Sequence, residues 1–228
     1  MSKQLNFLQI SLTNKCNMSC AYCPVEQWRN TTPSNPLKNS ELIPFLEKYV
    51  KPEQWVIELT GGEPSLYEGI DELMQWLSDN GYRTIVKTNG TGNLKHLPNV
   101  KIVAAFHDID NPPKNFDEVL IINTECREEK EVYCAAHGIP YKVIGYWRDN
   151  FDNATHGFHL CAFINPAGHQ IGCQGKEAKE HIVDGVDVAR IAHKMLIATT
   201  CCPTCKAAID AWKFIGGTEY VRRKQGTL

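Results

Sequence analysis

The sequence lacks any long apolar run and carries little net charge. Its opening residues, MSKQLNFLQI, hold no hydrophobic stretch long enough for a signal peptide or a membrane span. The formal net charge of −2 gives no electrostatic reason to expect nucleic acid or an anionic membrane as a partner. The sequence also has no internal repeat and no low-complexity segment. These absences favour a globular protein, and 228 residues suffice for one core with a small appendage.

Cysteine, by contrast, is abundant. Ten cysteines would suit a secreted disulfide scaffold, but such scaffolds are usually short domains. Here the cysteines cluster, as CxxxCxxC in residues 16–23 and as CCPTC in residues 201–205. Clustering of this kind indicates metal binding in a reducing compartment. We therefore expect a cytoplasmic protein with cysteine-ligated metal.

The first cluster, Cys16, Cys20 and Cys23, can bring three thiolates to one metal centre. Four thiolates would close a 4Fe–4S cluster. Three leave one iron without a protein ligand, so that another molecule can bind there. The alternative is a structural zinc site, which needs a fourth Cys or His that the neighbouring sequence does not supply.

The same segment resembles the radical S-adenosylmethionine (radical SAM) enzymes. Asn17 follows the first cysteine and Tyr22 precedes the last, as is common in that family, and a Gly-Gly-Glu-Pro turn follows at residues 61–64. The resemblance implies a 4Fe–4S cluster on the three cysteines, with S-adenosylmethionine chelating the open iron. It also implies that the turn holds the amino group of the cofactor's methionine, through the following residues: Gly61, Gly62, Glu63 and Pro64. Glu63 would pair with that positive group, and the two glycines would allow close backbone approach.

Hydrophobic patterning predicts strands that alternate with helices. The predicted strands cover residues 5–13, 55–60, 83–88, 101–106, 119–123 and 141–147. Helices are predicted over 41–50, with Pro44 in the first turn, from a Ser65–Glu68 capping box to Asn80-Gly81, and over 128–137. Alternation of this kind predicts a parallel sheet. Six units are too few for a closed eightfold barrel, so we expect an α/β fold with a partial (β/α)6 TIM-like barrel over residues 1–150, as the family resemblance also implies.

Ligands in parallel α/β folds bind at the carboxyl ends of the strands. Several polar side chains are predicted at this edge in addition to the cysteines and Glu63: Thr88, Asn89, His107, Asn123 and Cys126. We expect Thr88, Asn89 and Asn123 to contact the cofactor, as Tyr22 would. His107, followed by Asp108, is a candidate for orienting substrate or for acid–base chemistry, although a packed polar strand end is the simpler interpretation.

Residues 151–228 form a second predicted unit, in which the alternation stops. Residues 159–173 predict a hairpin that turns at 165–168, residues 176–199 predict two helical pieces, and a short helix follows CCPTC. Four of its cysteines can form one site: Cys161, Cys173, Cys202 and Cys205. This cysteine-rich hairpin-plus-helix appendage resembles the Twitch domain of radical SAM enzymes, which implies a second 4Fe–4S cluster. Zinc is the alternative, because CxxC pairs suit it equally well, and Cys201 competes with Cys202 as the ligand.

The resemblance implies reductive cleavage of S-adenosylmethionine to a 5′-deoxyadenosyl radical, which takes a hydrogen atom from a substrate carbon. Three functions stay open. The second cluster can accept an electron in a two-electron oxidation or a bond-forming step. Cys126 can instead donate a hydrogen atom in a redox-neutral epimerisation. The third is a non-catalytic iron–sulfur or zinc module, which would have no use for the Gly-Gly-Glu-Pro turn. We read Cys134, in a predicted helix, as a buried apolar residue.

The partner predictions follow from the same reasoning. Reduction of the cluster would need an electron donor such as a flavodoxin or ferredoxin. The chain begins almost at its first predicted strand, which favours a small-molecule substrate over a peptide that a preceding module would grip.

Overall fold

The computed structural model describes residues 6–20, 23, 29–32, 36–122, 126–144, 161–164, 169–171 and 177–181. The elements are, in chain order, β1 (Asn6–Ser11), α1 (Asn39–Tyr49), β2 (Trp55–Thr60), the 3₁₀-helix η2 (Pro64–Leu66), α2 (Ile70–Asp79), β3 (Arg83–Thr88), β4 (Val100–Ala105), β5 (Glu118–Ile122), α3 (Arg127–Ala136), β6 (Tyr141–Ile144), β7 (Cys161–Ile164), β8 (His169–Ile171) and β9 (Glu177–His181). Among the described residues, no helix combines the length and the apolar character needed to cross a membrane.

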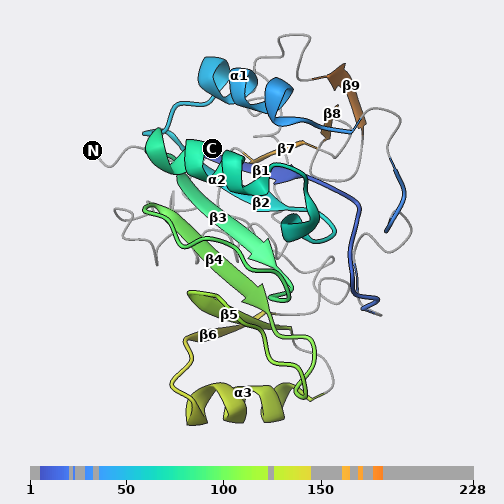
Figure 1. The fold of residues 1–228 in the computed structure, drawn as a ribbon, viewed down its shortest axis with the longest axis vertical. Coiled ribbons are helices and arrows are strands. Elements are labelled where there is room, and N and C mark those ends of the chain that lie inside the picture. Colours follow the sequence, from blue (N-terminus) through green and yellow to red (C-terminus); the bar gives the residue numbers. More distant parts are fainter. Residues whose placement is uncertain are drawn as a thin grey trace, which may run out of the picture.

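The first six strands form one parallel sheet in which spatial order follows chain order (Figure 1). This confirms the predicted α/β fold with a partial-barrel arrangement. The predicted bounds of β2 and β3 agree with the structure at both ends, and those of β1, β4 and β5 are displaced by one or two residues. The parallel order brings the carboxyl ends of β1, β2, β3 and β4 to one edge, where the candidate site lies.

One face of the sheet is covered by α1 and α2, which lie next to each other in Figure 1. The residues of their apolar stripes are buried, and they belong to one core with residues of β1 and β2 such as Leu8 and Ile57. The buried stripe residues are Leu42, Phe45 and Leu46 of α1, and Ile70, Leu73, Met74 and Leu77 of α2. Each fully buried side chain of this size contributes about 1.5–3 kcal/mol. The sheet edge that carries the site therefore rests on a fixed core.

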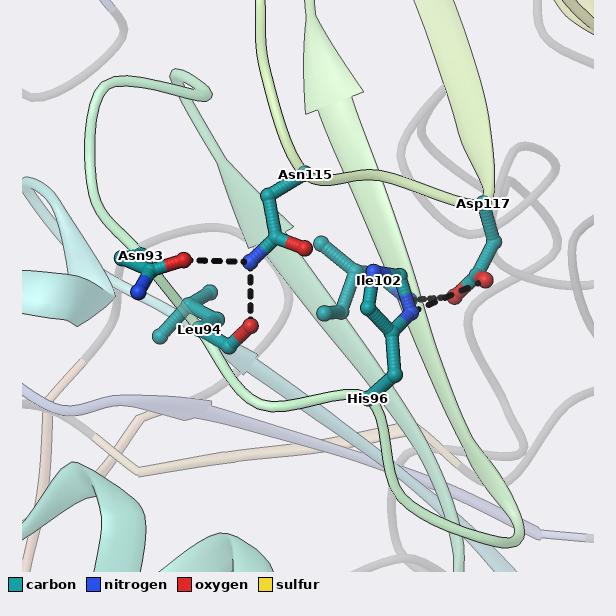
Figure 2. A network of polar contacts seen from close by, with 6 residues as sticks. All are labelled: Asn93, Leu94, His96, Ile102, Asn115 and Asp117. Carbon is teal, nitrogen blue, oxygen red and sulfur yellow. Dashed lines mark hydrogen bonds and ion pairs between the residues drawn. The ribbon is translucent and has the colours of Figure 1, made fainter.

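Two connections between the parallel strands contain no helix, in agreement with the three helices that the sequence predicts. The chain passes from β3 to β4, and from β4 to β5, without a helix. Side chains bind these two connections to each other (Figure 2): Asn115 Nδ2 donates to Asn93 Oδ1 at 3.2 Å and to the Leu94 carbonyl. Asp117 Oδ2 accepts from the backbone N–H of Ile102 at 2.7 Å, and its Oδ1 lies 3.3 Å from His96 Nδ1. Side-chain hydrogen bonds and an ion pair thus hold the β3–β4 and β4–β5 connections together, in place of a packed helix.

The bounds of α1 and α2 correct two predictions about helix starts. Because α1 begins at Asn39, Pro44 lies inside the helix and not in its first turn. Because proline has no N–H, the helix lacks one backbone hydrogen bond at this position. The ring of Pro44 is exposed on the surface of the helix. The predicted Ser65–Glu68 capping box is also wrong, since α2 begins at Ile70 with Gly69 as its N-cap. Ser65 instead belongs to η2, and its N–H donates to Glu63.

The described strands beyond residue 150 continue the main sheet. β7 pairs with β1 in parallel, and β8 pairs with β7 in antiparallel orientation, as the predicted hairpin requires. The prediction of helix at residues 176–199 is wrong for Glu177–His181, which is strand β9. EAKEH has good helix formers, but pairing with β8 overrides that local preference. Cys173, Cys202, Cys205 and the last predicted helix lie outside the described residues.

Candidate metal and cofactor site

The chain that leads to the three cysteines is hydrogen-bonded to the Gly-Gly-Glu-Pro turn. Leu12 N–H donates to the Thr60 carbonyl at 2.8 Å, Gly62 N–H donates to the Thr13 carbonyl at 2.6 Å, and Glu63 N–H donates to the Lys15 carbonyl at 2.8 Å. These bonds extend the parallel pairing of β1 and β2 past the ends of both strands. The two sequence motifs therefore share one backbone framework.

The two glycines of the turn are needed for this approach. A Cβ on Gly61 would lie 2.5 Å from the Thr13 carbonyl oxygen, and one on Gly62 would lie 2.2 Å from that of Lys15. Gly61 also has φ +142°, which side-chain-bearing residues rarely adopt. We expected these glycines to admit a cofactor, and the close approach that the structure shows is to the cysteine-bearing segment.

The three cysteines are partly exposed thiols. Backbone and side-chain bonds shape their loop: Cys16 N–H donates to Asn30 Oδ1 at 2.9 Å, Cys23 N–H donates to the Cys20 carbonyl at 3.1 Å, and Met18 N–H donates to Cys16 Sγ at 3.4 Å. Burial raises the pKa of the Cys20 thiol, and the neighbouring Cys16 and Cys23 raise it further. Binding of metal at Cys20 would therefore have to displace a proton.

This donor set fits the iron–sulfur cluster that the sequence predicts. Thiolates are the usual ligands of such clusters, and each binds a different iron. A cluster site therefore does not require its sulfurs to converge on one point. Among the described residues, no three His, Cys, Asp or Glu side chains are grouped as ligands of a single metal ion.

The Glu63 carboxylate is fully buried and joins the turn to the end of β3. Its Oε1 accepts from Ser65 N–H at 3.0 Å and from the Thr88 hydroxyl at 2.7 Å, and its Oε2 accepts from Asn89 N–H at 2.7 Å. A carboxylate has about four acceptor positions, so these bonds leave about one for a cofactor's amino group. The predicted cofactor residues Glu63, Thr88 and Asn89 are thus in direct contact.

Asn89 extends this network to the cysteine loop. Its Nδ2 donates to Asn17 Oδ1 at 2.8 Å, Asn17 Nδ2 donates to Thr91 Oγ1 at 2.8 Å, and Thr91 Oγ1 donates to Asn89 Oδ1 at 2.6 Å. The three side chains close a ring of hydrogen bonds. Sequence reasoning noted Asn17 only as a flank of the first cysteine and missed Thr91. The position of Thr91 just after the predicted end of β3 was the available signal.

His107 lies against the cysteine loop from the end of β4. Its Nδ1 is 3.3 Å from Cys20 Sγ. Burial, together with the nearby positive charge of Lys130, lowers the imidazole pKa to about 4. Asp108, its neighbour in sequence, accepts from Asp110 N–H at 3.0 Å and from Asn111 Nδ2 at 2.8 Å, and these bonds lower the pKa of its carboxyl group. The structure thus brings His107 to a predicted cluster ligand.

The other candidates are more distant or are not described. Cys126 follows β5 as the N-cap of α3, with an exposed side chain and φ 62°. Cys134 is fully buried within α3, as predicted, and burial raises its pKa. Cys161 begins β7, of which only the backbone is described. Tyr22 and Asn123 lie outside the described residues, as do three cysteines of the second set: Cys173, Cys202 and Cys205.

Comparison with known families agrees with the geometry. The profile of the Radical SAM superfamily matches residues 10–146. This span contains the cysteine loop, the Gly-Gly-Glu-Pro turn, the end of β1 and all of β2 to β6. The chain belongs to this superfamily. Membership implies a 4Fe–4S cluster and S-adenosylmethionine as cofactors.

Individual relatives match over part of their length. A GTP 3′,8-cyclase of Aquifex aeolicus is 31% identical over 153 residues, which cover 63% of this chain and 47% of that protein. A 7-carboxy-7-deazaguanine synthase of Methanothermobacter thermautotrophicus is 28% identical over 152 residues, covering 58% and 61%. The chain therefore spans less than two thirds of either relative.

Among solved structures, Streptococcus suis SuiB is similar with a TM-score of 0.56 at 11% identity, covering 82% of this chain and 65% of that one. At this identity the likeness concerns the fold alone.

Proposed function

We propose that this chain is a radical SAM enzyme that cleaves S-adenosylmethionine reductively, with a 4Fe–4S cluster held by Cys16, Cys20 and Cys23. When bound, the cluster and S-adenosylmethionine supply a 5′-deoxyadenosyl radical that abstracts a hydrogen atom from substrate. The observation that carries the proposal is the bonding of Gly62 and Glu63 to the backbone of residues 13–15. These hydrogen bonds join the turn that would bind the amino group directly to the segment that leads to the three cysteines.

The residues of the chain have separable tasks in this proposal. The cysteines bind the cluster, and the turn at residues 61–64 orients the methionine end of the cofactor. The Glu63 carboxylate supports that turn through Thr88 and Asn89, and its remaining acceptor position is suited to an ammonium group. Pre-organisation of this kind lowers the entropic cost of placing the cofactor.

The test is cleavage of S-adenosylmethionine by the anaerobically reconstituted protein under strong reductant. Wild type should form 5′-deoxyadenosine, and the triple variant Cys16→Ala, Cys20→Ala, Cys23→Ala should form none. Cys134→Ala is the matched control, because it removes a thiol that is buried in α3 away from the loop. Product from the triple variant, or none from wild type with a loaded cluster, would refute the proposal.

We further propose a small-molecule substrate. The names of two relatives, a GTP 3′,8-cyclase and a 7-carboxy-7-deazaguanine synthase, specify a nucleotide and a modified purine base. Candidate nucleotides and bases should therefore be screened before peptides, with hydrogen-atom transfer from labelled substrate into 5′-deoxyadenosine as the readout. A peptide substrate found in the same screen would overturn this part of the proposal alone.

The four cysteines Cys161, Cys173, Cys202 and Cys205 are proposed as a second metal site. Metal analysis of wild type against Cys202→Ala, Cys205→Ala should distinguish its occupants. About eight irons per chain indicate two clusters, while about four irons with one zinc indicate a structural site. Loss of about four irons in the double variant would assign the second cluster to these residues.

A redox-neutral reaction is the second candidate, and the position of Cys126 favours it. This cysteine follows β5 near the edge that carries the cluster site, and its side chain is exposed. In this reaction the thiol would give its hydrogen atom to the substrate radical, breaking the S–H bond and forming a C–H bond. The resulting thiyl radical would return to the thiol by taking one electron from the donor that reduces the cluster and one proton from solvent. Product formed in D₂O should then carry one deuterium, and Cys126→Ala should lose that label. Unlabelled product from wild type would exclude the role.

A further inference from the structure

The environment of the three cysteines is unequal. Cys20 is the cysteine whose Sγ lies 3.3 Å from the Nδ1 atom of His107. Cys16 Sγ instead receives the N–H of Met18 from its own loop, at 3.4 Å. The His107 contact comes from the segment that follows β4, eighty-seven residues further along the chain. It therefore depends on the fold and not on the local turn.

His107 is held in place by its surroundings. It directly follows Phe106, which is buried at 1% exposure and packs edge-on against Tyr133 of α3 with ring centroids 5.5 Å apart. On the following side, Asp108 is fixed in its turn by Asp110 and Asn111. Because Phe106 and Asp108 are both held in place, the fold itself sets the position of the His107 imidazole against the cysteine loop.

The direction of the contact follows from chemistry. A cysteine that binds iron is a thiolate, which has lost its S–H and can only accept hydrogen bonds. Nδ1 must then be the donor. Hydrogen bonds to the sulfurs of an iron–sulfur cluster are one of the determinants of its reduction potential. Reduction adds negative charge to the cluster, and an N–H aimed at a sulfur stabilises that charge.

We propose that His107 is a positioning residue that donates a hydrogen bond from Nδ1 to Cys20 Sγ, and thereby favours reduction of the cluster at the Cys16–Cys20–Cys23 site. The inference rests on the proposed function, since it needs a cluster at that site. It assigns His107 to electron entry in place of substrate acid–base chemistry.

The test uses three forms of the reconstituted protein. In His107→Leu the donor is removed while the size of the side chain is approximately kept, and in His107→Asn the amide nitrogen can take the place of Nδ1. Each is poised at a fixed potential near the wild-type midpoint, and the ratio of reduced to oxidised cluster is measured by EPR. We expect that ratio to fall about fivefold in His107→Leu, the factor for one ordinary hydrogen bond, and to recover in His107→Asn. Equal ratios in all three forms would overturn the inference.

A second measurement needs no variant. Wild type labelled with ¹⁵N only in histidine should show a weak nitrogen coupling to the reduced cluster in pulsed EPR, as expected for a hydrogen-bonded imidazole. No coupling would contradict the contact, and a coupling as strong as that of a directly bound imidazole would replace it with ligation. A different result would refute the proposed function itself. In that case wild type would not bind about four irons at this site, or its spectrum would not respond to S-adenosylmethionine.

Discussion

The side-chain amide of Asn89 donates a hydrogen bond to Asn17 Oδ1 at 2.8 Å, although seventy-two residues separate the two in sequence. Asn89 stands at the end of β3, where its backbone N–H also binds the Glu63 carboxylate. Asn17 lies directly after Cys16 in the cysteine loop. One residue thus connects the Gly-Gly-Glu-Pro turn to the loop that carries the proposed cluster ligands.

Replacing Asn89 by Asp should loosen the cysteine loop without unfolding the protein. The carboxylate keeps the acceptor for Thr91 and leaves the backbone bond to Glu63 in place. It removes the donor to Asn17, which costs about 1 kcal/mol of loop stability. Amide hydrogen exchange of residues 13–20 in the metal-free protein should therefore accelerate about fivefold.

The matched control is Asn99→Asp, which makes the same change of charge in the turn before β4. Asn99 has φ 58°, a conformation that Asp tolerates well. Exchange of residues 13–20 should stay at the wild-type rate in this variant. Equal acceleration in both variants would show that charge, and not the Asn17 contact, controls the loop.

Gly62→Ala should displace the cysteine loop from the turn. The added Cβ would lie 2.2 Å from the Lys15 carbonyl oxygen, a backbone atom that cannot rotate away. Overpacking of this kind typically costs about 1–3 kcal/mol. We expect a lower thermal midpoint and less iron bound per chain after reconstitution.

Gly138→Ala is the control for a Gly-to-Ala change that destabilises the protein without overlap and outside the site. Gly138 has φ +64°, and a Cβ there would meet nothing within 4 Å. This variant should lose about 1–2 kcal/mol from the left-handed conformation alone and should bind iron as wild type does. If Gly62→Ala also bound iron normally, the close packing of the two motifs would not be needed for the site.

Local sequence patterns predicted much of this architecture, because the spacing of apolar residues reflects which side chains are buried. The stripe of Leu73, Met74 and Leu77 repeats with helical period, and all three are fully buried in α2. β2 and β3 were delimited correctly because Lys-Pro-Glu-Gln, Gly-Gly and Asn-Gly segments bound runs of β-prone residues. The position of the cysteines, Glu63 and His107 at one edge followed from the parallel order of the strands.

The contacts within the site could not be predicted in the same way. The bonds of Glu63 to Thr88 and Asn89 depend on the register between β2 and β3, which no local pattern specifies. The contact of His107 with Cys20 likewise requires the packing of two distant loops. Strand β9 was missed because its residues favour helix in isolation, and pairing with β8 is not visible from its own sequence.

Glu63→Gln should destabilise the protein even without cofactor. The carboxylate accepts three hydrogen bonds while fully buried, and an amide would point an N–H₂ group at one of the donors. The resulting unsatisfied contact costs about 1–3 kcal/mol. Urea unfolding of the metal-free variant should therefore have a lower midpoint.

Glu68→Gln is the control, since it changes an exposed glutamate just beyond η2. It should unfold at nearly the same urea concentration as wild type. A Glu63→Gln protein with wild-type stability but weak binding of S-adenosylmethionine would mean that the carboxylate acts on the cofactor and not on the end of β3.

Tyr82→Phe should weaken the attachment of α1 to the segment before β3. The buried Tyr82 hydroxyl donates to the Val50 carbonyl at 2.9 Å and to the Leu46 carbonyl at 3.3 Å, both at the end of α1. Its loss should lower the free energy of unfolding at pH 8 by about 1–2 kcal/mol. Tyr49→Phe, which removes a hydroxyl from a partly buried tyrosine of the same helix, should lower it less.

The same hydroxyl predicts how stability depends on alkaline pH. Burial raises the pKa of Tyr82 to about 12 from an ordinary 10.0, and the charges of Glu47 and Glu53 add to the effect. The folded protein therefore holds this proton between pH 10 and 12 while the unfolded chain releases it, so stability falls as the pH rises through that range. Tyr67, whose pKa is also raised to about 12, contributes in the same direction. Urea unfolding at pH 8, 10 and 11 should show a shallower decline for Tyr82→Phe than for wild type, and parallel declines would mean that Tyr82 titrates alike in both states.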